Sequence, residues 1–396
     1  MAFRLFKVQK ERGIHIGTDK TFLGGMTPGT FDFGVDVNNE SSKKITAFYA
    51  GVRLRAENIA SLPRTVNKKD SKGSWVKAVG HPVYNLIAGR PNSYTNAFDF
   101  YNQLSANLDG WGNAYAIIKR DDKGDPVSLH QVHPSYVSIV FEGGYKFYKV
   151  DILDPDFKWL NGTYHSSDML HFMLLSYDGI KGVNPVVYNA TALGKALATE
   201  RFAAEYYKRG GNVKGVLETD SHLDDDQYKS FTKHFDSAQN FSTPLLEFGI
   251  KYKQLSISPV AAQLLESEKM SINDICRILN IPPHMLSELS HATFSNIEHQ
   301  TIQFVQYSLR PTLKRFEVEL ESKLLTRDER EYMSIKFDLQ GLLRGDTATR
   351  SAFYHNAIQD GWMSRNEVRH LENMPAASGL DEFMRPANMI IDGNEE

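Results

Sequence analysis

The fold of this chain is decided by the stretch Ile281-Pro282-Pro283-His284-Met285-Leu286, which Ala292-Thr293-Phe294-Ser295-Asn296-Ile297-Glu298 and Arg310-Pro311 follow. Proline lacks an amide proton and disfavours helix in the residue before it, so the Pro-Pro pair ends the preceding helix. A short polar loop then crosses to a second long helix that begins at Ser295 or Asn296. Pro311 bends this second helix. The stretch therefore predicts a helix, a loop and a bent helix.

A small α+β unit lies between two helices upstream of this stretch. The first helix runs from Pro185 to Arg209, and Gly210-Gly211 closes it as a C-terminal cap. Pro259 opens the second helix, which reaches Asn280, at a position where proline costs a helix nothing. The pattern between the two helices predicts a strand at 213–218, a helix at 224–238, and strands at 245–248 and 251–257.

The first half of the chain predicts an antiparallel sheet packed with helices. Apolar residues from Ile45 to Ile59 recur at three- and four-residue steps, which predicts a helix with one buried face that ends at Pro63. A polar turn at 68–73 joins a hairpin of strands at 64–66 and 75–79. The other expected elements are helices at 81–88 and 96–109, the latter burying Phe98, Tyr101, Leu104 and Leu108, and strands at 115–119, 127–132, 136–141 and 145–150.

The two ends of the chain are expected to be simpler. Residues 1–43 carry scattered glycines without periodicity, which predicts a flexible arm that orders only against a neighbour. A strand at 332–337 leads into helices at 347–360 and 365–372, and Gly361 stops the first of them. The residues beyond them are typical of loop.

Composition limits the function classes. The chain has 396 residues, 41% of them hydrophobic, and a net charge of −3, so it is long enough for two or three domains but lacks the basic footprint of a sequence-specific nucleic-acid binder. Its one cysteine, Cys276, lies in an apolar helical pattern and is expected to be a buried small side chain. No apolar run is long enough to cross a membrane and no signal peptide is evident, so we expect action in the cytoplasm or in an assembly made there.

Common catalytic motifs are absent from the sequence. No Gly-x-x-x-x-Gly-Lys-Ser/Thr loop is present, and Lys208-Arg209-Gly210-Gly211-Asn212 lacks the spacing to cradle phosphates. There is also no Gly-x-Ser-x-Gly and no Cys-x-x-Cys pair. The sequence therefore argues against an ATP-driven motor and against common hydrolases and zinc ribbons.

The strongest enzymatic alternative is a metal site at His284, Glu288 and His291. On a regular helix their spacing of four and three places all three on one face, which suits zinc or manganese with an open position for water. Ser287, Ser290 and the preceding prolines favour instead a short turn and a polar loop. The alternatives are therefore a metal-dependent nuclease and a loop that faces solvent.

Two other polar clusters favour structural interpretations. Asp224-Asp225-Asp226 opens an expected helix, where carboxylates complement the positive end of the helix dipole more often than they bind a cation. His130 and His133 lie on or just after a strand and lack a third ligand. The aromatic residues near 98–101 and in Trp111-Gly112-Asn113-Ala114-Tyr115 lack interleaved Arg or Lys, so we expect core packing rather than base stacking.

A series of short motifs occurs in an order that resembles the portal proteins of tailed bacteriophages. The 281–311 stretch belongs to this series. The other members, in chain order, are Tyr49-Ala50-Gly51-Val52, Gly110-Trp111-Gly112-Asn113-Ala114-Tyr115, His133-Pro134, Asp168-Met169-Leu170-His171-Phe172, Arg344-Gly345-Asp346 and Asn366-Glu367-Val368-Arg369. The resemblance covers roughly residues 40–390.

The resemblance implies an α+β portal fold that assembles as a cyclic ring. Its parts would be an N-terminal arm (1–43), a mixed α/β wing (44–184), a stem of two helices (185–212 and 258–281), an α+β clip (213–257), a tunnel loop (282–295), the bent helix with a wing strand (296–340) and a short helical crown (341–396). The segment between Asp236 and Leu245 looks short for the family, which leaves the clip's detailed shape open.

The resemblance also implies the function and the partners. Dodecameric rings at one capsid vertex would form the channel for packaging and ejection of double-stranded DNA, with no cofactor, no metal, no membrane and no catalytic residue. The terminase large subunit, the major capsid protein and scaffold, and a head-tail adaptor would be partners in a virion assembled in the bacterial cytoplasm. The residues implied are Ser287, Glu288, Ser290, His291 and Thr293 facing DNA, Asp224, Asp225, Asp226 and Lys229 facing the motor, and Pro311 at the kink. A monomeric adaptor is a further alternative.

Overall fold

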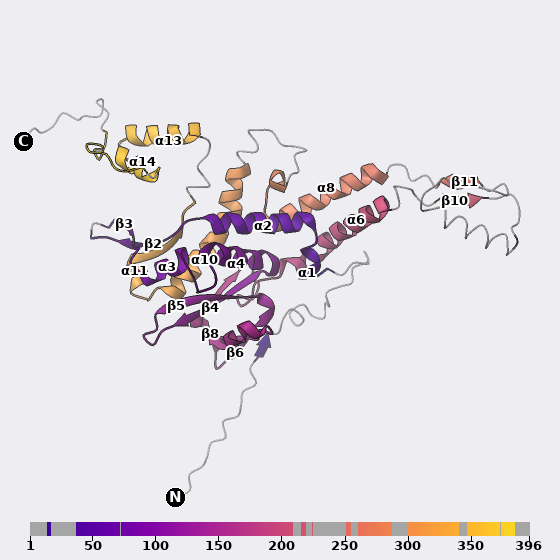
Figure 1. Ribbon diagram of the computed structural model, residues 1–396, viewed down its shortest axis with the longest axis horizontal. Coiled ribbons are helices and arrows are strands. Elements are labelled where there is room, and N and C mark those ends of the chain that lie inside the picture. The colour runs from indigo at the N-terminus through magenta and orange to yellow at the C-terminus, as the bar shows by residue number, and fades with distance from the viewer. Residues whose placement is uncertain are drawn as a thin grey trace, which may run out of the picture.

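The computed structural model describes residues 14–16, 37–71, 73–208, 215–218, 224, 251–254, 260–286, 300–339, 347–372 and 374–384. Together they form a mixed α+β fold, as expected (Figure 1). None of the described helices is long and apolar enough to span a membrane.

The described residues up to Met173 form α-helices, 3₁₀ turns and nine strands. The helical elements are α1 (Asn39–Ser42), α2 (Thr46–Ser61), α3 (Pro82–Ala88), α4 (Ala97–Trp111), and the 3₁₀ turns η1 (Pro134–Tyr136), η2 (Pro155–Leu160) and η3 (Ser166–Asp168). The strands are β1 (Ile14–Ile16), β2 (Arg64–Lys69), β3 (Trp75–Lys77), β4 (Asn113–Arg120), β5 (Pro126–Val132), β6 (Val137–Glu142), β7 (Tyr145–Val150), β8 (Gly162–His165) and β9 (Met169–Met173).

The described residues of the rest of the chain are mostly helical. Its helical elements are α5 (Pro185–Tyr188), α6 (Ala190–Lys208), α8 (Val260–Leu279), η4 (Pro283–Leu286), the π-helical η5 (Phe304–Leu309), α10 (Arg310–Leu324), α11 (Glu329–Tyr332), α13 (Thr347–Gln359) and α14 (Arg365–Leu371). Its strands are β10 (Gly215–Glu218), β11 (Lys251–Gln254) and β12 (Met333–Phe337).

The expected single antiparallel sheet is in fact two sheets. β4 pairs with β5 on one edge and β9 on the other, so neither edge is left for β6. β6 instead lies between β1 and β7, and β8 completes that sheet. The change of sheet occurs at Pro134, which lacks the amide proton that a strand would use and opens η1.

The expected hairpin forms and gains a third strand from far along the chain. β2 pairs antiparallel with β3, as predicted. β12 pairs with the other edge of β2, with Ile335 opposite Val66. Both of these residues are fully buried, so this sheet joins the N-terminal helices to the segment that follows α10.

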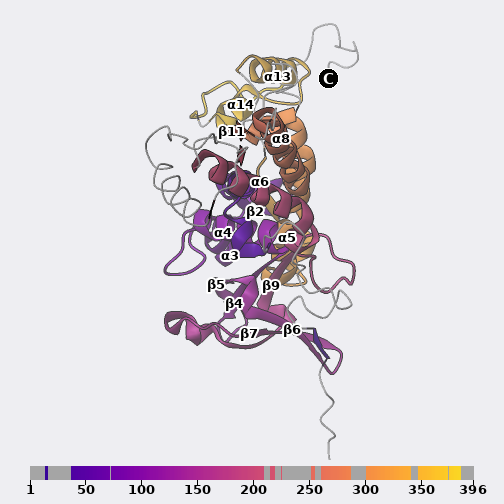
Figure 2. The ribbon, with the colours of Figure 1, turned by 90° about the vertical axis from the view of Figure 1, so that its right-hand side faces the viewer.

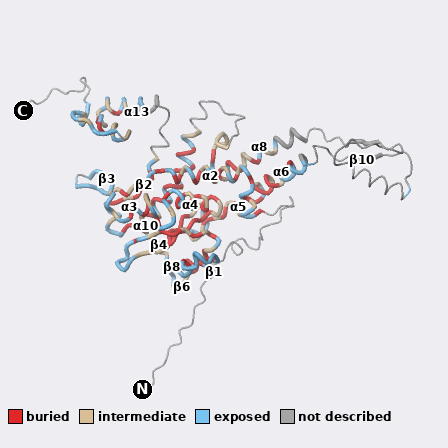
Figure 3. Tube along the Cα trace, viewed as in Figure 1, coloured by how far each residue is buried: buried red, intermediate tan, exposed pale blue. Residues whose placement is uncertain are grey.

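The main core lies between α2, α4, α10 and the sheets (Figure 3). Its centre is aromatic. The Tyr101 ring packs edge-on against the rings of Phe316 and Phe337, with centroid distances of 6.0 and 5.4 Å. The centroids of the Phe172 and Phe316 rings are 4.4 Å apart. The core interpretation of these aromatics is confirmed, with one error. Phe98 is 42% exposed, because the buried stripe of α4 begins at Ala97 and Phe100.

Helices α6 and α8 run side by side from the body toward the β10–β11 pair (Figures 1 and 2). The sequence predicts one helix from Pro185, whereas the structure has α5 and α6 separated at Asn189. The Asn189 side chain donates to the Pro185 carbonyl at 2.8 Å, a local hydrogen bond that competes with helix continuation.

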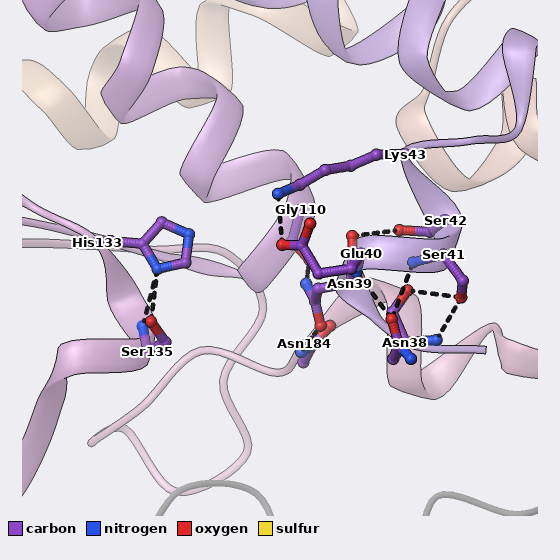
Figure 4. A network of polar contacts seen from close by, with 10 residues as sticks. All are labelled: Asn38, Asn39, Glu40, Ser41, Ser42, Lys43, Gly110, His133, Ser135 and Asn184. Carbon is purple, nitrogen blue, oxygen red and sulfur yellow. Dashed lines mark hydrogen bonds and ion pairs between the residues drawn. The ribbon is translucent and has the colours of Figure 1, made fainter. Parts of the chain in front are cut away.

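The segment that leads into α2 is fixed by side-chain amides (Figure 4). Asn38 caps α1, and its side-chain oxygen accepts from the Glu40 and Ser41 amides. Asn39 donates to the Gly110 carbonyl at 2.6 Å and accepts from the Asn184 side chain at 3.0 Å. One asparagine therefore links α1, the end of α4 and the start of α5.

Candidate functional site

The candidate site is a joint at which α8 ends and η4, η5 and α10 meet beside α2. We define the joint by residues 279–286 and 300–312 together with Arg55 and Asp109. The elements of the joint flank the segment 287–299, which lies outside the described residues. A close approach at Gly51 brings α2 against it, since a Cβ there would lie 2.5 Å from the Leu279 Cδ1 atom.

The end of α8 adopts a left-handed cap. Asn280 has a φ of 53°, a conformation that asparagine tolerates better than most residues. The Ile281 amide then donates to the Cys276 carbonyl at 2.9 Å, which satisfies one of the last acceptors of the helix. Pro282 and Pro283 follow and open η4, so the chain leaves α8 in a fixed direction.

The helix made of η5 and α10, which we call the bent helix after the bend that the sequence predicts at Pro311, has a π-helical segment that ends at Leu309. Proline has no amide proton to give to the carbonyl four residues back, which here is the carbonyl of Tyr307. That oxygen accepts instead from the Asn280 side-chain amide at 2.9 Å. The wider π turn and this bond together accommodate the proline without an unsatisfied acceptor, and they tie α8 to the bent helix.

Arg55 is buried at the centre of the joint and contacts α4, α8 and the bent helix. Its Nε donates to the Asp109 carboxylate of α4 at 2.8 Å. Its Nη1 donates to the Leu279 carbonyl at 3.0 Å and to the Ser308 hydroxyl. Its Nη2 donates to the Thr312 hydroxyl at 3.2 Å. Burial raises the pKa of Asp109, and the Arg55 guanidinium opposes that shift.

His284 and Gln300 close the base of the 287–299 segment. The His284 Nδ1 and the Gln300 Oε1 are 2.7 Å apart. The described residues before and after the segment 287–299 therefore contact each other here. Glu288 and His291, the other members of the alternative metal site, lie outside the described residues. Within the described residues no group of three potential ligands gathers, and nothing supports the metal-dependent nuclease.

Of the other predicted site residues, Asp224 and Pro311 lie within the described part. Asp224 is described and is exposed. The remaining predicted residues lie outside the described part: Ser287, Ser290 and Thr293 of the predicted tunnel loop, and Asp225, Asp226 and Lys229 of the predicted clip.

Sequence reasoning missed Arg55 and Asp109, although one signal was present. Arg55 falls within the apolar stripe of α2, three residues after Val52 and four before Ile59. A charged residue at such a position requires a buried partner. The partner itself could not be inferred, because Asp109 lies on a different helix.

A second polar cluster, which the sequence did not indicate, joins the sheet of β4, β5 and β9 and the sheet of β6, β7 and β8 to α10. His171 of β9 stacks on Tyr115 at 4.4 Å, and its Nδ1 lies 3.0 Å from the Tyr148 hydroxyl of β7. The Glu319 carboxylate accepts from the His171 amide at 3.0 Å. Burial holds the pKa of His171 well below its usual value, and burial lowers the pKa of nearby Lys146 to about 8.

His130, His133 and Cys276 have structural partners. His130 Nδ1 lies 2.9 Å from the Tyr94 hydroxyl, and its Nε2 lies 2.8 Å from the Ser128 hydroxyl. His133 caps η1 through its Nδ1. Cys276 is buried, as expected.

The two buried histidines predict a loss of stability in acid. Burial lowers the pKa of His130 to about 4, and burial keeps that of His171 well below 6.5. In the unfolded chain these two histidines take up protons near pH 6.5, and in the folded chain they do not. The free energy of unfolding should therefore fall between about pH 6.5 and 5, by up to about 1.4 kcal/mol per pH unit for each histidine.

Urea unfolding at several pH values measures this effect. His171→Gln removes one of the two titrating groups, so its free energy of unfolding should fall less steeply over this interval. The double variant with His130→Gln should have a shallower slope still. If the free energy of unfolding fell equally steeply with pH for the unmodified chain and the double variant, the two histidines would not be the groups responsible.

Comparison with known proteins covers most of the chain. A family model described as phage portal protein matches residues 46–373. The chain is 26% identical over 362 residues to the portal protein of Enterobacteria phage HK97, across 89% of this chain and 84% of that protein. It is 27% identical over 382 residues to the probable portal protein of Streptomyces phage phiC31, across 91% of this chain and 82% of that protein.

Solved structures share the fold. A chain from the virion of a native gene transfer agent particle superposes with a TM-score of 0.60 at 19% identity, across 86% of this chain and 94% of that chain. An HK97 family phage portal protein from Corynebacterium diphtheriae superposes with a TM-score of 0.59 at 14% identity, across 78% of this chain and 98% of that chain.

Proposed function

Because the chain belongs to the phage portal protein family, we propose that it forms a closed ring at one capsid vertex, through whose axis double-stranded DNA enters and leaves. The observation that carries the proposal is the match over residues 46–373, which spans the body, the paired helices and the joint. The copy number that we propose, twelve, is the one that the family resemblance implies. A chain of the same fold occurs in a gene transfer agent virion, which supports a location in the particle.

The parts of the subunit are assigned by this proposal. The wing takes residues 44–184 with the segment 296–340, the stem takes α6 and α8, and the clip takes the β10–β11 unit at their far end. The tunnel loop begins at η4 and the crown takes α13 and α14. The joint then holds the two ends of the loop at a fixed separation, through Asn280 with Tyr307 and His284 with Gln300.

The proposed role is geometric rather than catalytic. DNA must slide through a channel, and every phosphate that a lysine or arginine neutralises adds salt-dependent affinity that opposes sliding. A net charge of −3 suits passage better than docking. We propose the clip as the surface for the terminase large subunit and later for a head-tail adaptor, and the wing as the surface for the capsid and scaffold.

Deleting residues 287–292 tests the channel role. The His284–Gln300 contact and the Arg55 contacts lie outside the deletion, so the body should keep its melting temperature and its ring. Complementation of a portal-deficient phage by the deletion variant should yield particles with at least about tenfold less packaged DNA. The count of DNA-filled heads by electron microscopy measures this.

A matched replacement serves as the control for chain length. Replacing residues 287–292 with an equally long Gly-Ser segment separates loss of side chains from shortening of the loop. Full packaging by both variants would contradict the proposed role of this loop. A large drop in melting temperature would place the segment in the core instead.

A further inference from the structure

A cavity of about 550 Å³ opens between α2, α6, α8 and η4. Its wall is mostly apolar and includes Leu54, Ile272 and Met285. A volume in this range holds compact apolar groups in ordinary binding sites. No described side chain of the same subunit fills it, and the residues that line it include Thr46, Arg53 and Glu57, which are exposed, so the cavity opens to the surface.

The cavity carries negative charge. Among the described residues that line it, Glu57, Glu200 and Glu268 are acidic and Arg53 is basic. Arg53 and Glu57 form an exposed pair at 3.8 Å. Burial, with the Glu268 charge nearby, raises the pKa of Glu200, whose carboxylate accepts from the Thr46 amide. A partner that brings positive charge to the mouth would relieve the excess of carboxylates.

The outward face of the bent helix has the complementary character. Tyr307 is 67% exposed, and Ile302 and Val318 are exposed with it. Arg310, three residues after Tyr307, and Arg315, three residues before Val318, are exposed with them, because residues three or four apart are neighbours on a helix surface. The one carboxylate between residues 300 and 318, Glu317, points inward and binds the Phe337 amide and Lys336. The exposed face is therefore apolar and basic.

The cavity and this face lie on different sides of one subunit. Arg55 of α2 contacts Ser308 and Thr312, the inward residues of the bent helix. Arg53 lines the cavity, and residues two apart on a helix point about 200° apart. The bent helix and the cavity are thus on opposite sides of α2, so a subunit cannot fill its own cavity with the outward face.

We propose that the Tyr307 side chain of one subunit enters the cavity of a second copy, with Arg310 and Arg315 facing Glu57 and Glu268 at its mouth. The proposal rests on the ring proposed above and names the surfaces that build it. Two different surfaces of the same chain meet, which is a head-to-tail contact that closes into a ring when the rotation between copies permits.

Charge reversal on each surface, followed by mixing, tests the pairing. The helix variant carries Arg310→Glu and Arg315→Glu, and the cavity variant carries Glu57→Arg and Glu268→Arg. Glu200 is left unchanged because it binds the Thr46 amide. Each variant alone should need at least about a tenfold higher concentration to form rings, since like charges then face each other.

An equimolar mixture should restore rings. The negative helix face of the first variant meets the positive cavity of the second, and the positive helix face of the second meets the unmodified cavity of the first. Native mass spectrometry should therefore show rings with equal numbers of the two variants. The remote, exposed substitution Lys149→Glu should leave assembly unchanged.

The outcomes separate this pairing from the proposed ring itself. If the unmodified chain forms rings and both variants do so at the same concentration, the pairing is wrong and the ring stands. If each folded variant alone forms no rings and their mixture also forms no rings, the pairing is again wrong. If the unmodified chain forms no ring, the proposed function fails first. Thermal melting of each variant verifies that it folds.

Discussion

Replacing Gly112 with alanine is expected to lower the free energy of unfolding by about 3 kcal/mol or more. Gly112 has a φ of 71° and ends α4. A left-handed conformation costs an alanine about 1–2 kcal/mol. A Cβ there would also lie 1.9 Å from the Val183 carbonyl oxygen, so backbone at the start of α5 would have to move. Urea unfolding followed by tryptophan fluorescence, with Trp111 adjacent, measures the loss.

Gly110→Ala is the matched control. It lies two residues earlier on the same helix, and a Cβ there meets nothing within 4 Å. Alanine is the better helix former by roughly 0.5–1 kcal/mol, so this change should leave stability unchanged or raise it slightly. Equal losses at the two positions would contradict the steric account.

Asp109→Ala is expected to destabilise the joint by about 3–5 kcal/mol, the cost of leaving a buried cation without its partner. The Arg55 guanidinium would keep its contacts to Leu279, Ser308 and Thr312 but would lose its only described counter-ion. The same urea unfolding experiment measures the effect.

A double variant separates the two contributions. Arg55→Met with Asp109→Leu removes both charges and refills the volume, so it should lose much less stability than Asp109→Ala alone. The Thr312 hydroxyl retains a bond to the Ser308 carbonyl in that variant. A double variant that is as unstable as Asp109→Ala would show that the guanidinium contributes through its hydrogen bonds, not through pairing with the carboxylate.

Local patterns predicted the elements well and their pairing less well. The helix from Thr46, the hairpin at β2 and β3 and the helix that Gly361 ends follow from periodicity, turn residues and caps, which are encoded within a few residues. The pairing of β12 with β2 joins segments far apart in the chain. Such pairing depends on tertiary packing, which short-range patterns do not report.

The joint shows the same division. Pro282 and Pro283 predicted the end of a helix and Pro311 predicted a bend, because proline restricts its own backbone. The hydrogen bond from the Asn280 side chain to the Tyr307 carbonyl could not be predicted from the sequence, since it depends on how two helices cross. The loop between them was expected from the polar residues after the prolines, whereas its place in a DNA tunnel came only from the family resemblance. The predicted DNA-facing residues beyond Leu286 stay predictions.

Imaging of the purified, unmodified chain by single-particle electron microscopy tests the central claim most directly. We expect closed rings with a central hole at micromolar protein and moderate salt, with twelve subunits in each ring and the segment after Leu286 facing the axis. Light scattering on the same sample should give the mass of such a ring. Compact monomers in every image, with a monomer mass in solution, would contradict the account.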